Sequence, residues 1–211
     1  MFRLISATPS PYARKVRIAL LEKAIPFKLV TEVPWDHTTT VPQHNPLEKL
    51  PVLICEDGSS VYESSFILEW LETKFPKPAL YPADPVERLR ARRLEVLGDG
   101  VCDAVVLTFF ENMRDANSVS TEWLARQRRK IEGGMSAIAE LIGSKTYAVG
   151  NQFSLGDIAA GTTLAYLETR YPKLEWRSLY PNLAIYSDNL EQRESFAQTK
   201  PVPQKITDKV V

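Results

Sequence analysis

The sequence is poor in three features that mark specialised proteins: cysteine, an excess of one charge, and long apolar runs. Its 211 residues include two cysteines, Cys55 and Cys102, too few for a disulfide framework or a cysteine-based metal cluster. Lysine and arginine together number 26, as do aspartate and glutamate. This zero net charge argues against a general nucleic-acid-binding protein, which would normally carry a basic excess.

No segment approaches the roughly 18 apolar residues that a membrane-spanning helix needs, and the N-terminus does not resemble a signal peptide. We therefore expect a cytoplasmic protein that uses no metal and has neither a membrane nor a nucleic acid as its partner. The composition, 44% hydrophobic and 25% charged, is typical of a globular protein. The length allows one large domain or two small ones.

Residues 1–75 alternate between strand-like and helix-like segments. A glycine-containing turn at 56–59 joins the last two strand candidates as a β-hairpin. This order predicts a small mixed sheet with helices on its faces. The expected strands are 2–5, 27–30, 52–55 and 60–62, and the expected helices are 12–23 and 64–75.

Beyond a proline-rich linker at 76–85, the chain has only helical periodicity. The predicted fold is therefore α/β plus all-α, with an α/β domain at 1–77 followed by an all-helical domain at 86–211. The last ten residues, 202–211, are expected to form a loosely held tail. The expected helices of the second domain are 86–114, 121–142, 155–171 and 181–194.

The first candidate site is the stretch 8-TPSPYARKVRIALLEK-23, in which Ser10 and Pro11 precede a helix. Serine as the N-cap residue and proline in the first helical position are what helix capping alone favours. The same geometry places a hydroxyl beside free backbone N–H groups and the positive end of the helix dipole, where an anion or a thiolate would bind. Both interpretations of Ser10 remain open at this point.

Two further stretches have the same ambiguity. In 45-NPLEKLPVL-53, Pro51 would interrupt a strand, so it either starts the strand or follows a cis bond that leaves the Leu50 backbone free to pair with an extended ligand. In 62-YESSFILEWLE-72, Ser64 is the expected N-cap residue of a helix and Glu63 precedes it. This pair would stabilise the helix, or it would bind the ammonium and carboxylate groups of an α-amino-acid ligand.

Taken in order, these stretches resemble the cytosolic glutathione S-transferases over essentially the whole chain. The stretch 154-SLGDIAAG-161 is similar to the family's C-terminal signature, in which Ser154 and Asp157 begin a buried helix. SPYARKVRIALLEK and PWDH are most similar to the serine-type classes, tau and zeta, with omega close behind. The resemblance implies a thioredoxin-like N-terminal domain followed by an all-helical C-terminal domain. A serine instead of a cysteine at position 10 argues against omega-type thiol-transferase chemistry.

Carried over residue by residue, the resemblance implies that glutathione is the co-substrate. Ser10 would be the catalytic residue, since its hydroxyl would donate a hydrogen bond to the glutathione sulfur. The Leu50 backbone beside a cis Pro51 would pair with the cysteinyl unit. Glu63 and Ser64 would bind the γ-glutamyl end.

His37 is a departure from the family pattern. The resemblance to tau and omega members implies a lysine at this position, near the glycine carboxylate of glutathione. Lys49 could share the role of binding that carboxylate. A neutral histidine holds a carboxylate less firmly than a lysine does. We therefore expect a glutathione affinity that is lower or pH dependent.

The implied activity is detoxification by transfer of glutathione to a small hydrophobic electrophile. Phe109, Phe110 and Met113 recur at helical spacing, which also fits ordinary core packing. The Tyr12 phenol is an alternative to Ser10 as the hydrogen-bond donor to the sulfur. The residues expected around the second-substrate pocket are Tyr12, Trp35, Phe109, Phe110 and Met113.

Two alternatives remain. A glutathione-dependent isomerase, dehalogenase or ether-cleaving enzyme would use the same sulfur site, and a non-catalytic binding or regulatory protein would use the same fold. The resemblance further implies a homodimer, in which the α/β domain of one chain faces the helical domain of the other. The basic helix that includes Arg88 would suit such an interface.

Overall fold

The chain folds into two compact units. The computed structural model describes residues 1–211. One unit contains residues 1–80 and 194–209, and the other contains 81–193 with the last two residues. The expected domain borders, 1–77 and 86–211, refer to order along the chain and stay a prediction. In space, the segment 194–209 belongs with the first unit.

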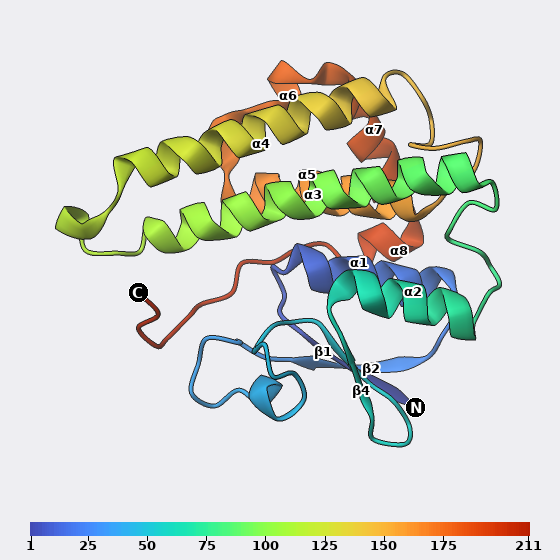
Figure 1. Cartoon of the computed structure of the whole chain (residues 1–211), viewed down its shortest axis with the longest axis horizontal. Coiled ribbons are helices and arrows are strands. Elements are labelled where there is room, and N and C mark those ends of the chain that lie inside the picture. Colours follow the sequence, from blue (N-terminus) through green and yellow to red (C-terminus); the bar gives the residue numbers. More distant parts are fainter. The chain divides into compact units, whose positions relative to one another are not determined.

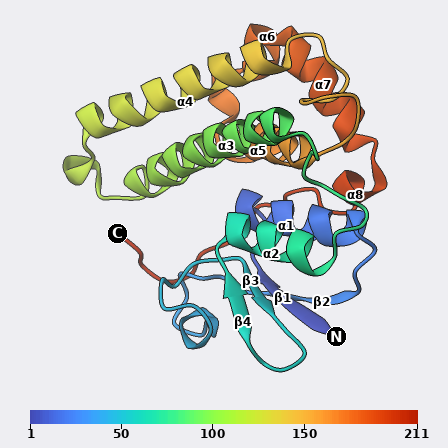
Figure 2. The same cartoon turned by 45° about the vertical axis from the view of Figure 1, so that its right-hand side comes forward.

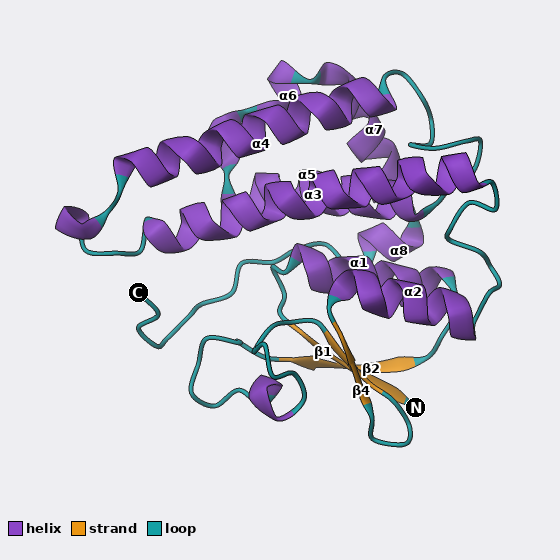
Figure 3. Ribbon diagram, viewed as in Figure 1, coloured by secondary structure: helices purple, strands orange, loops and turns teal.

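The first unit is built on a four-stranded mixed sheet with the order β2-β1-β3-β4. Its strands are orange in Figure 3. β1 and β2 are parallel, whereas β3 is antiparallel to both β1 and β4. The predicted small mixed sheet is confirmed, with strand ends that differ by at most one residue from those expected. The strands are β1 (Phe2–Ser6), β2 (Phe27–Thr31), β3 (Val52–Ile54) and β4 (Ser60–Tyr62).

Two helices, α1 (Pro11–Glu22) and α2 (Ser64–Lys74), lie on the same side of the sheet and pack against each other (Figures 1 and 2). Their apolar residues and those of the strands form the core of this unit. A short helix, α8 (Glu194–Ala197), returns from the far end of the sequence to pack on α1. The fully or almost fully buried side chains of this core include Leu4, Val16, Leu20, Leu53, Ile67 and Leu71.

A buried arginine ties the returning segment to α1. The Arg14 side chain is 2% exposed, and its Nε donates to Thr199 Oγ1 at 3.2 Å while its Nη2 donates to the Phe196 carbonyl at 3.1 Å. The guanidinium also lies 5.2 Å from the centroid of the Phe196 ring. A buried cation needs such partners to offset its desolvation, so these contacts anchor the start of the C-terminal segment.

The second unit is all-helical, as predicted. α3 packs against both α4 and α5, and α7 packs against α5. α5 is buried along residues 155–167, which makes it the central helix of the unit. None of the helices combines the length and the apolarity that a bilayer crossing demands. The helices are α3 (Pro85–Glu111), α4 (Thr121–Ile142), α5 (Leu155–Arg170), α6 (Trp176–Leu179) and α7 (Pro181–Glu191).

The start of α5 depends on one buried carboxylate. Asp157 is 0% exposed. Its Oδ2 accepts from the Ser154 backbone N–H at 2.8 Å and from the Ser154 hydroxyl at 3.1 Å. Its Oδ1 accepts from the Ala148 N–H at 2.8 Å and from the Tyr186 hydroxyl at 2.6 Å. Asp157 thereby joins the preceding loop, the helix start and α7, which agrees with the structural role expected for this pair.

One helix ends earlier than its apolar pattern predicts. The helix expected at 86–114 stops at Glu111, where Asn112 becomes the C-cap residue. The Asn112 backbone N–H and side chain both donate to the Thr108 carbonyl, at 3.1 and 2.7 Å, and the next N–H, of Met113, donates three residues back to the Phe110 carbonyl at 3.0 Å. Met113 therefore lies outside α3, in the turn that follows it.

Candidate functional site

The register of the sheet brings several candidate residues to one edge. β1 and β2 end together, because Ser6 pairs with Thr31. β3 begins beside the end of β1, since Val52 pairs with Ile5. β4 ends beside the start of β3, since Tyr62 pairs with Val52. We call this the exit edge, because β1, β2 and β4 all leave the sheet there.

Four chain segments meet the sheet at the exit edge and carry candidate residues. Ser10 follows β1, His37 lies in the loop after β2, Leu50 and Pro51 precede β3, and Glu63 follows β4. Both α1 and α2 begin at this edge. The free N–H groups of two helix N-termini therefore lie there, and these favour negatively charged ligand groups.

Ser10 is the N-cap residue of α1, as predicted. Its Oγ accepts a hydrogen bond from the Ala13 backbone N–H at 3.2 Å, and Pro11 occupies the first helical position. Because the oxygen is the acceptor in this contact, its O–H remains a donor. Ser10 is partly exposed. A hydroxyl donor at a helix N-terminus is suited to hold an anion or a thiolate.

The Leu50–Pro51 peptide bond is cis, which is one of the two arrangements expected for this proline. The loop before it is organised by Asn45, which is 1% exposed. The Asn45 side chain donates to the Lys49 carbonyl at 2.8 Å and accepts from the Leu47 N–H at 2.9 Å. Its amide thus bridges the two ends of the turn, while the Lys49 side chain is exposed at the exit edge.

Glu63 is the N-cap residue of α2, so the expectation that Ser64 would cap this helix is wrong. Glu63 has φ 72°, and in this conformation its carboxylate folds back to accept from the Ser65 N–H at 3.2 Å and the Phe66 N–H at 3.3 Å. Ser64 is instead the first helical residue, and its buried hydroxyl donates to Glu63 Oε1 at 3.1 Å. A left-handed conformation at a residue other than glycine is costly and is often found at ligand sites.

The loop that carries His37 is organised by another carboxylate. Glu32 accepts hydrogen bonds from the Thr39 hydroxyl at 2.6 Å, and from the Thr40 N–H at 2.7 Å and the Thr40 hydroxyl at 2.6 Å. Burial raises the pKa of Glu32, but these hydrogen bonds together lower it by more than burial raises it, so the net shift of the pKa is downward. The carboxylate therefore stays ionised and holds the loop in shape.

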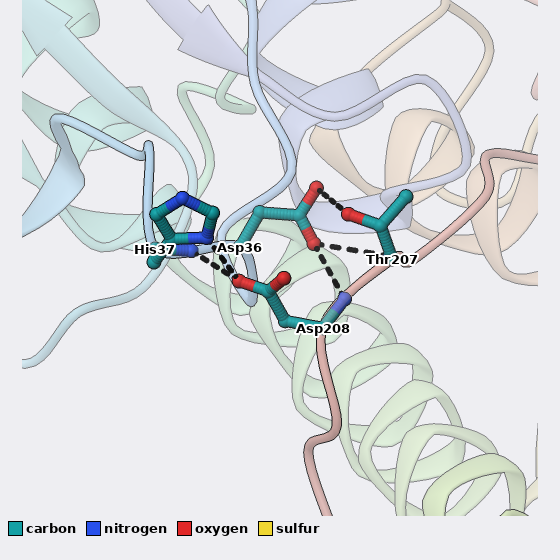
Figure 4. Close-up of polar contacts among 4 residues, drawn as sticks. All are labelled: Asp36, His37, Thr207 and Asp208. Carbon is teal, nitrogen blue, oxygen red and sulfur yellow. Dashed lines mark hydrogen bonds and ion pairs between the residues drawn. The ribbon is translucent and has the colours of Figure 1, made fainter.

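The C-terminal segment reaches His37, which the sequence did not indicate. Asp208 Oδ2 accepts from the His37 backbone N–H at 2.6 Å and lies 2.8 Å from the ring Nδ1 (Figure 4). Asp36 in turn accepts from Thr207, through its N–H at 3.2 Å and its hydroxyl at 3.0 Å. The expectation of a loosely held tail is wrong, because polar side chains 171 residues apart bind each other.

These contacts change the acidity of both partners. The hydrogen bond with Asp208 and the negative charge of Asp208 raise the pKa of His37. The backbone and ring N–H groups of His37 lower the pKa of Asp208. The pair therefore favours an imidazolium beside a carboxylate. Asp36, Thr207 and Asp208 are the residues of this site that sequence reasoning missed, since no local pattern links them.

The five residues expected around a second pocket divide between the two units. Tyr12 and Trp35 belong to the first unit, and the other three to the helical unit. Phe109 and Phe110 contact each other edge to face, with ring centroids 5.2 Å apart. Met113 and Trp35 are 44% and 45% exposed. That all five line one pocket stays a prediction.

Comparison with known proteins supports the resemblance noted in the sequence. A family model described as the glutathione S-transferase N-terminal domain matches residues 9–74, and one described as the C-terminal domain matches 121–189. An uncharacterized GST-like protein of Escherichia coli, YibF, is 37% identical over 199 residues, which cover 94% of this chain and 98% of that protein.

Two solved structures with bound ligands are similar to this chain. A glutathione S-transferase from Methylobacterium radiotolerans, in complex with glutathione sulfonate, is 66% identical with a TM-score of 0.99, over 100% of this chain and 99% of that one. A glutathione S-transferase from Methylobacillus flagellatus with glutathione bound is 40% identical with a TM-score of 0.92, over 96% and 100% of the two chains.

Proposed function

Because the chain belongs to the glutathione S-transferase family, we propose that it is a serine-type transferase that joins the thiolate of glutathione to a small hydrophobic electrophile. The observation that carries the proposal is the Ser10 hydroxyl, a donor at the N-terminus of α1. In the reaction the sulfur forms a bond to the electrophilic carbon, and the leaving group departs with the electron pair of the bond that breaks.

The other ends of glutathione would be held by groups at the exit edge. The Glu63 carboxylate, which retains lone pairs beside the two N–H groups that it caps, would accept from the γ-glutamyl ammonium. The Leu50 backbone would pair with the cysteinyl unit, as the family resemblance implies. His37 and the exposed Lys49 are the two candidates for the glycine carboxylate. These assignments support a peptide-like ligand with charges at both ends.

The gain from thiolate stabilisation itself is modest. A thiol with a pKa of about 8.5 is only about 3% ionised at pH 7, and a pKa of about 6.5 would raise that fraction to about 75%. Nucleophilicity falls with basicity, by roughly eightfold over two pKa units. The net gain is therefore about threefold. Most of the acceleration must come from positioning the electrophile against the sulfur, so substrate choice belongs to the second pocket.

The test is Ser10→Ala, compared with Ser10→Thr, which keeps the hydroxyl. We expect the alanine variant to raise the pKa of the bound thiol by about two units, because its hydrogen-bond donor is gone. Turnover at pH 7 should then fall about threefold, and more at lower pH. The pKa is measured from the ultraviolet absorbance of the bound thiolate between pH 5 and 9, in parallel with conjugation of a small aryl halide.

The same titration on Tyr12→Phe separates the two candidate donors. If Ser10 is the donor, the phenylalanine variant should leave the pKa of the bound thiol unchanged. An unchanged thiol pKa in Ser10→Ala would contradict the role proposed for Ser10, and a raised one in Tyr12→Phe would transfer that role to the phenol. A protein that binds no glutathione at millimolar concentration would favour the non-catalytic alternative.

We further propose that the protein forms a homodimer. Val86, Leu89, Arg93 and Val96 share one face of α3 at helical spacing, and the three apolar side chains are 57%, 70% and 67% exposed. Phe66 on α2 is 57% exposed. Exposed apolar side chains gathered on one helix face are typical of an interface. We expect light scattering at micromolar concentration to give twice the chain mass; a monomer mass would contradict this proposal.

A further inference from the structure

The segment after α8 runs along the exit edge and is bound there at several points. The Val202 N–H donates to the Thr8 carbonyl at 3.3 Å, two residues before Ser10. The Gln204 side chain donates to the Glu32 carbonyl at 3.3 Å. These two contacts place Val202 beside the start of α1 and Gln204 beside the end of β2, so the following residues of the tail lie next to the loop that carries His37.

The last contacts form a reciprocal pair, which we call the tail clasp: Asp36, His37, Thr207 and Asp208 (Figure 4). The Asp36 carboxylate accepts from the backbone N–H groups of Thr207 and Asp208, at 3.2 and 3.4 Å. The Asp208 carboxylate accepts from the backbone N–H of His37 at 2.6 Å. Each aspartate thus binds the main chain of the segment that carries the other, which defines the register between loop and tail.

Asp208 also determines which nitrogen of the His37 ring is available to a ligand. Its Oδ2 lies 2.8 Å from Nδ1, so Nδ1 carries a proton that it donates to the carboxylate. The ring is 82% exposed, and Nε2 is on the opposite side of the ring from Nδ1. In a neutral ring with its proton on Nδ1, Nε2 would be an acceptor and would repel a ligand carboxylate. In the imidazolium, Nε2–H is a donor.

The charge of the clasp favours the imidazolium. Asp208 on the tail and Asp36 on the same loop are the charged groups that act on the ring, and both raise the pKa of His37. A lysine in this position would be cationic without help, whereas a histidine with its ordinary pKa of about 6.5 is mostly neutral at pH 7.5. Asp208 therefore favours the positive charge that a lysine would carry without help and that a histidine with an ordinary pKa would mostly lack.

We propose that Asp208 is a positioning residue for glutathione, which orients His37 through Nδ1 and its backbone N–H so that Nε2–H donates to the glycine carboxylate of the ligand. This inference rests on the proposed function, since it concerns the same ligand. It assigns the C-terminal tail to the binding site. His37, held by the tail, is then the residue that binds the glycine carboxylate of glutathione.

The tail would have the opposite effect if it competed with the ligand for His37. Asp36 and Asp208 bring two negative charges close to a site for a carboxylate, and Asp208 already occupies one ring nitrogen. A tail that acted as a competitor would weaken glutathione binding, and its removal would tighten it. The two effects have opposite signs, so one measurement separates them.

The experiment is calorimetric titration with S-methylglutathione between pH 5.5 and 8.5. This ligand has no thiol, so ionisation of the sulfur does not enter the profile. Wild-type affinity should fall as the pH rises through the pKa of His37. Asp208→Asn keeps the shape and acceptor oxygen of the side chain but removes its charge. We expect its inflection to move to lower pH, with a three- to tenfold weaker Kd at pH 7.5, where a ring with an ordinary pKa of about 6.5 is about 90% neutral, and little change at pH 5.5.

Three further variants complete the design. Lys209→Gln changes the neighbouring charge of the tail and should leave the profile unchanged. His37→Gln should flatten the profile, and Asp208→Asn should add nothing in that background. A chain that ends at Lys205 lacks Thr207 and Asp208, so it should show the pH shift of Asp208→Asn together with a loss of affinity at every pH, because the acceptor of the His37 N–H is gone as well.

The outcomes separate this inference from the proposed function. If wild-type protein binds no S-methylglutathione at millimolar concentration, the proposed function itself is wrong and this inference falls with it. If binding occurs but Asp208→Asn leaves the pH profile in place, or shifts Kd equally at every pH, the positioning role is wrong while the function stands. Tighter binding without the tail would equally overturn the positioning role.

Discussion

Replacement of Asp157 by alanine should lower the free energy of unfolding by about 4 kcal/mol. The carboxylate accepts four hydrogen bonds, from the Ala148 N–H, the Ser154 N–H and hydroxyl, and the Tyr186 hydroxyl. Its loss leaves buried donors without partners, each at a cost of about 1–3 kcal/mol, although the hydroxyls can turn to other acceptors. Urea denaturation measures the change, and thermal unfolding should shift down by roughly 10 °C.

Asp188→Ala is the matched control for this variant. Asp188 lies on α7, like Tyr186, but it is exposed and bound to Arg177 at 2.9 Å on the surface. An exposed ion pair contributes little, so we expect a change below about 0.5 kcal/mol. Equal stability losses in the two variants would show that the buried network at the start of α5 is not the source of the effect.

The stability that Asp157 contributes should also depend on pH. Burial raises its pKa, and the hydrogen bonds from Tyr186, Ala148 and Ser154 offset only part of that rise. A carboxyl whose pKa is higher in the folded state than in the unfolded state makes the fold less stable as the pH rises between the two values. Asp157→Ala removes this contribution, so its stability loss should be larger at pH 4 than at pH 7.

Replacement of Glu63 by glutamine should weaken glutathione binding by about 10- to 100-fold. The carboxylate is proposed to bind the γ-glutamyl ammonium, and a hydrogen bond to a charged group contributes about 1.5–3 kcal/mol. Glutamine keeps an acceptor oxygen for the N–H groups of Ser65 and Phe66, so α2 should retain most of its cap. Calorimetric titration with S-methylglutathione at pH 7 gives the Kd.

Two controls make this prediction specific. Glu69→Gln removes an exposed charge from the same helix and should leave Kd unchanged. An analogue of S-methylglutathione without the α-amino group should bind wild type and Glu63→Gln equally, because the group that Glu63 would bind is missing. If the variant loses as much affinity for this analogue as for the parent ligand, the carboxylate does not act through the ammonium.

Elements with strong local signals were predictable to the residue. The bounds expected for α4, 121–142, are those observed, because Ser120 caps its start and Gly143, at φ 57°, follows its end. Ser10 was likewise recognisable as a cap, since a serine before a proline and an apolar helical run is a local pattern. Signals of this kind depend on residues within one helical turn of each other.

The predicted helix ends were wrong where backbone conformation or hydrogen bonding overrode a common sequence pattern. The cap of α2 was assigned to Ser64 because serine is a common N-cap residue, but Glu63 adopts a left-handed conformation and folds its longer side chain onto the helix. The expected end of the helix at 114 followed apolar periodicity through Met113, whereas the helix ends at Glu111 and the Met113 N–H donates to the Phe110 carbonyl, three residues back. Backbone conformation and the choice between carbonyls three and four residues back have no periodic signature.

The sequence by itself determined the family, the mixed sheet with its helical partner unit, and the cap at Ser10, because each depends on short motifs or on periodic burial. Only the tertiary structure decided that the ends of β1, β2 and β4 share one edge, and that the tail binds this edge. The clasp joins polar side chains that are 171 residues apart. No composition or periodicity encodes such a pairing; it exists because α8 returns to α1 and Arg14 anchors the chain there.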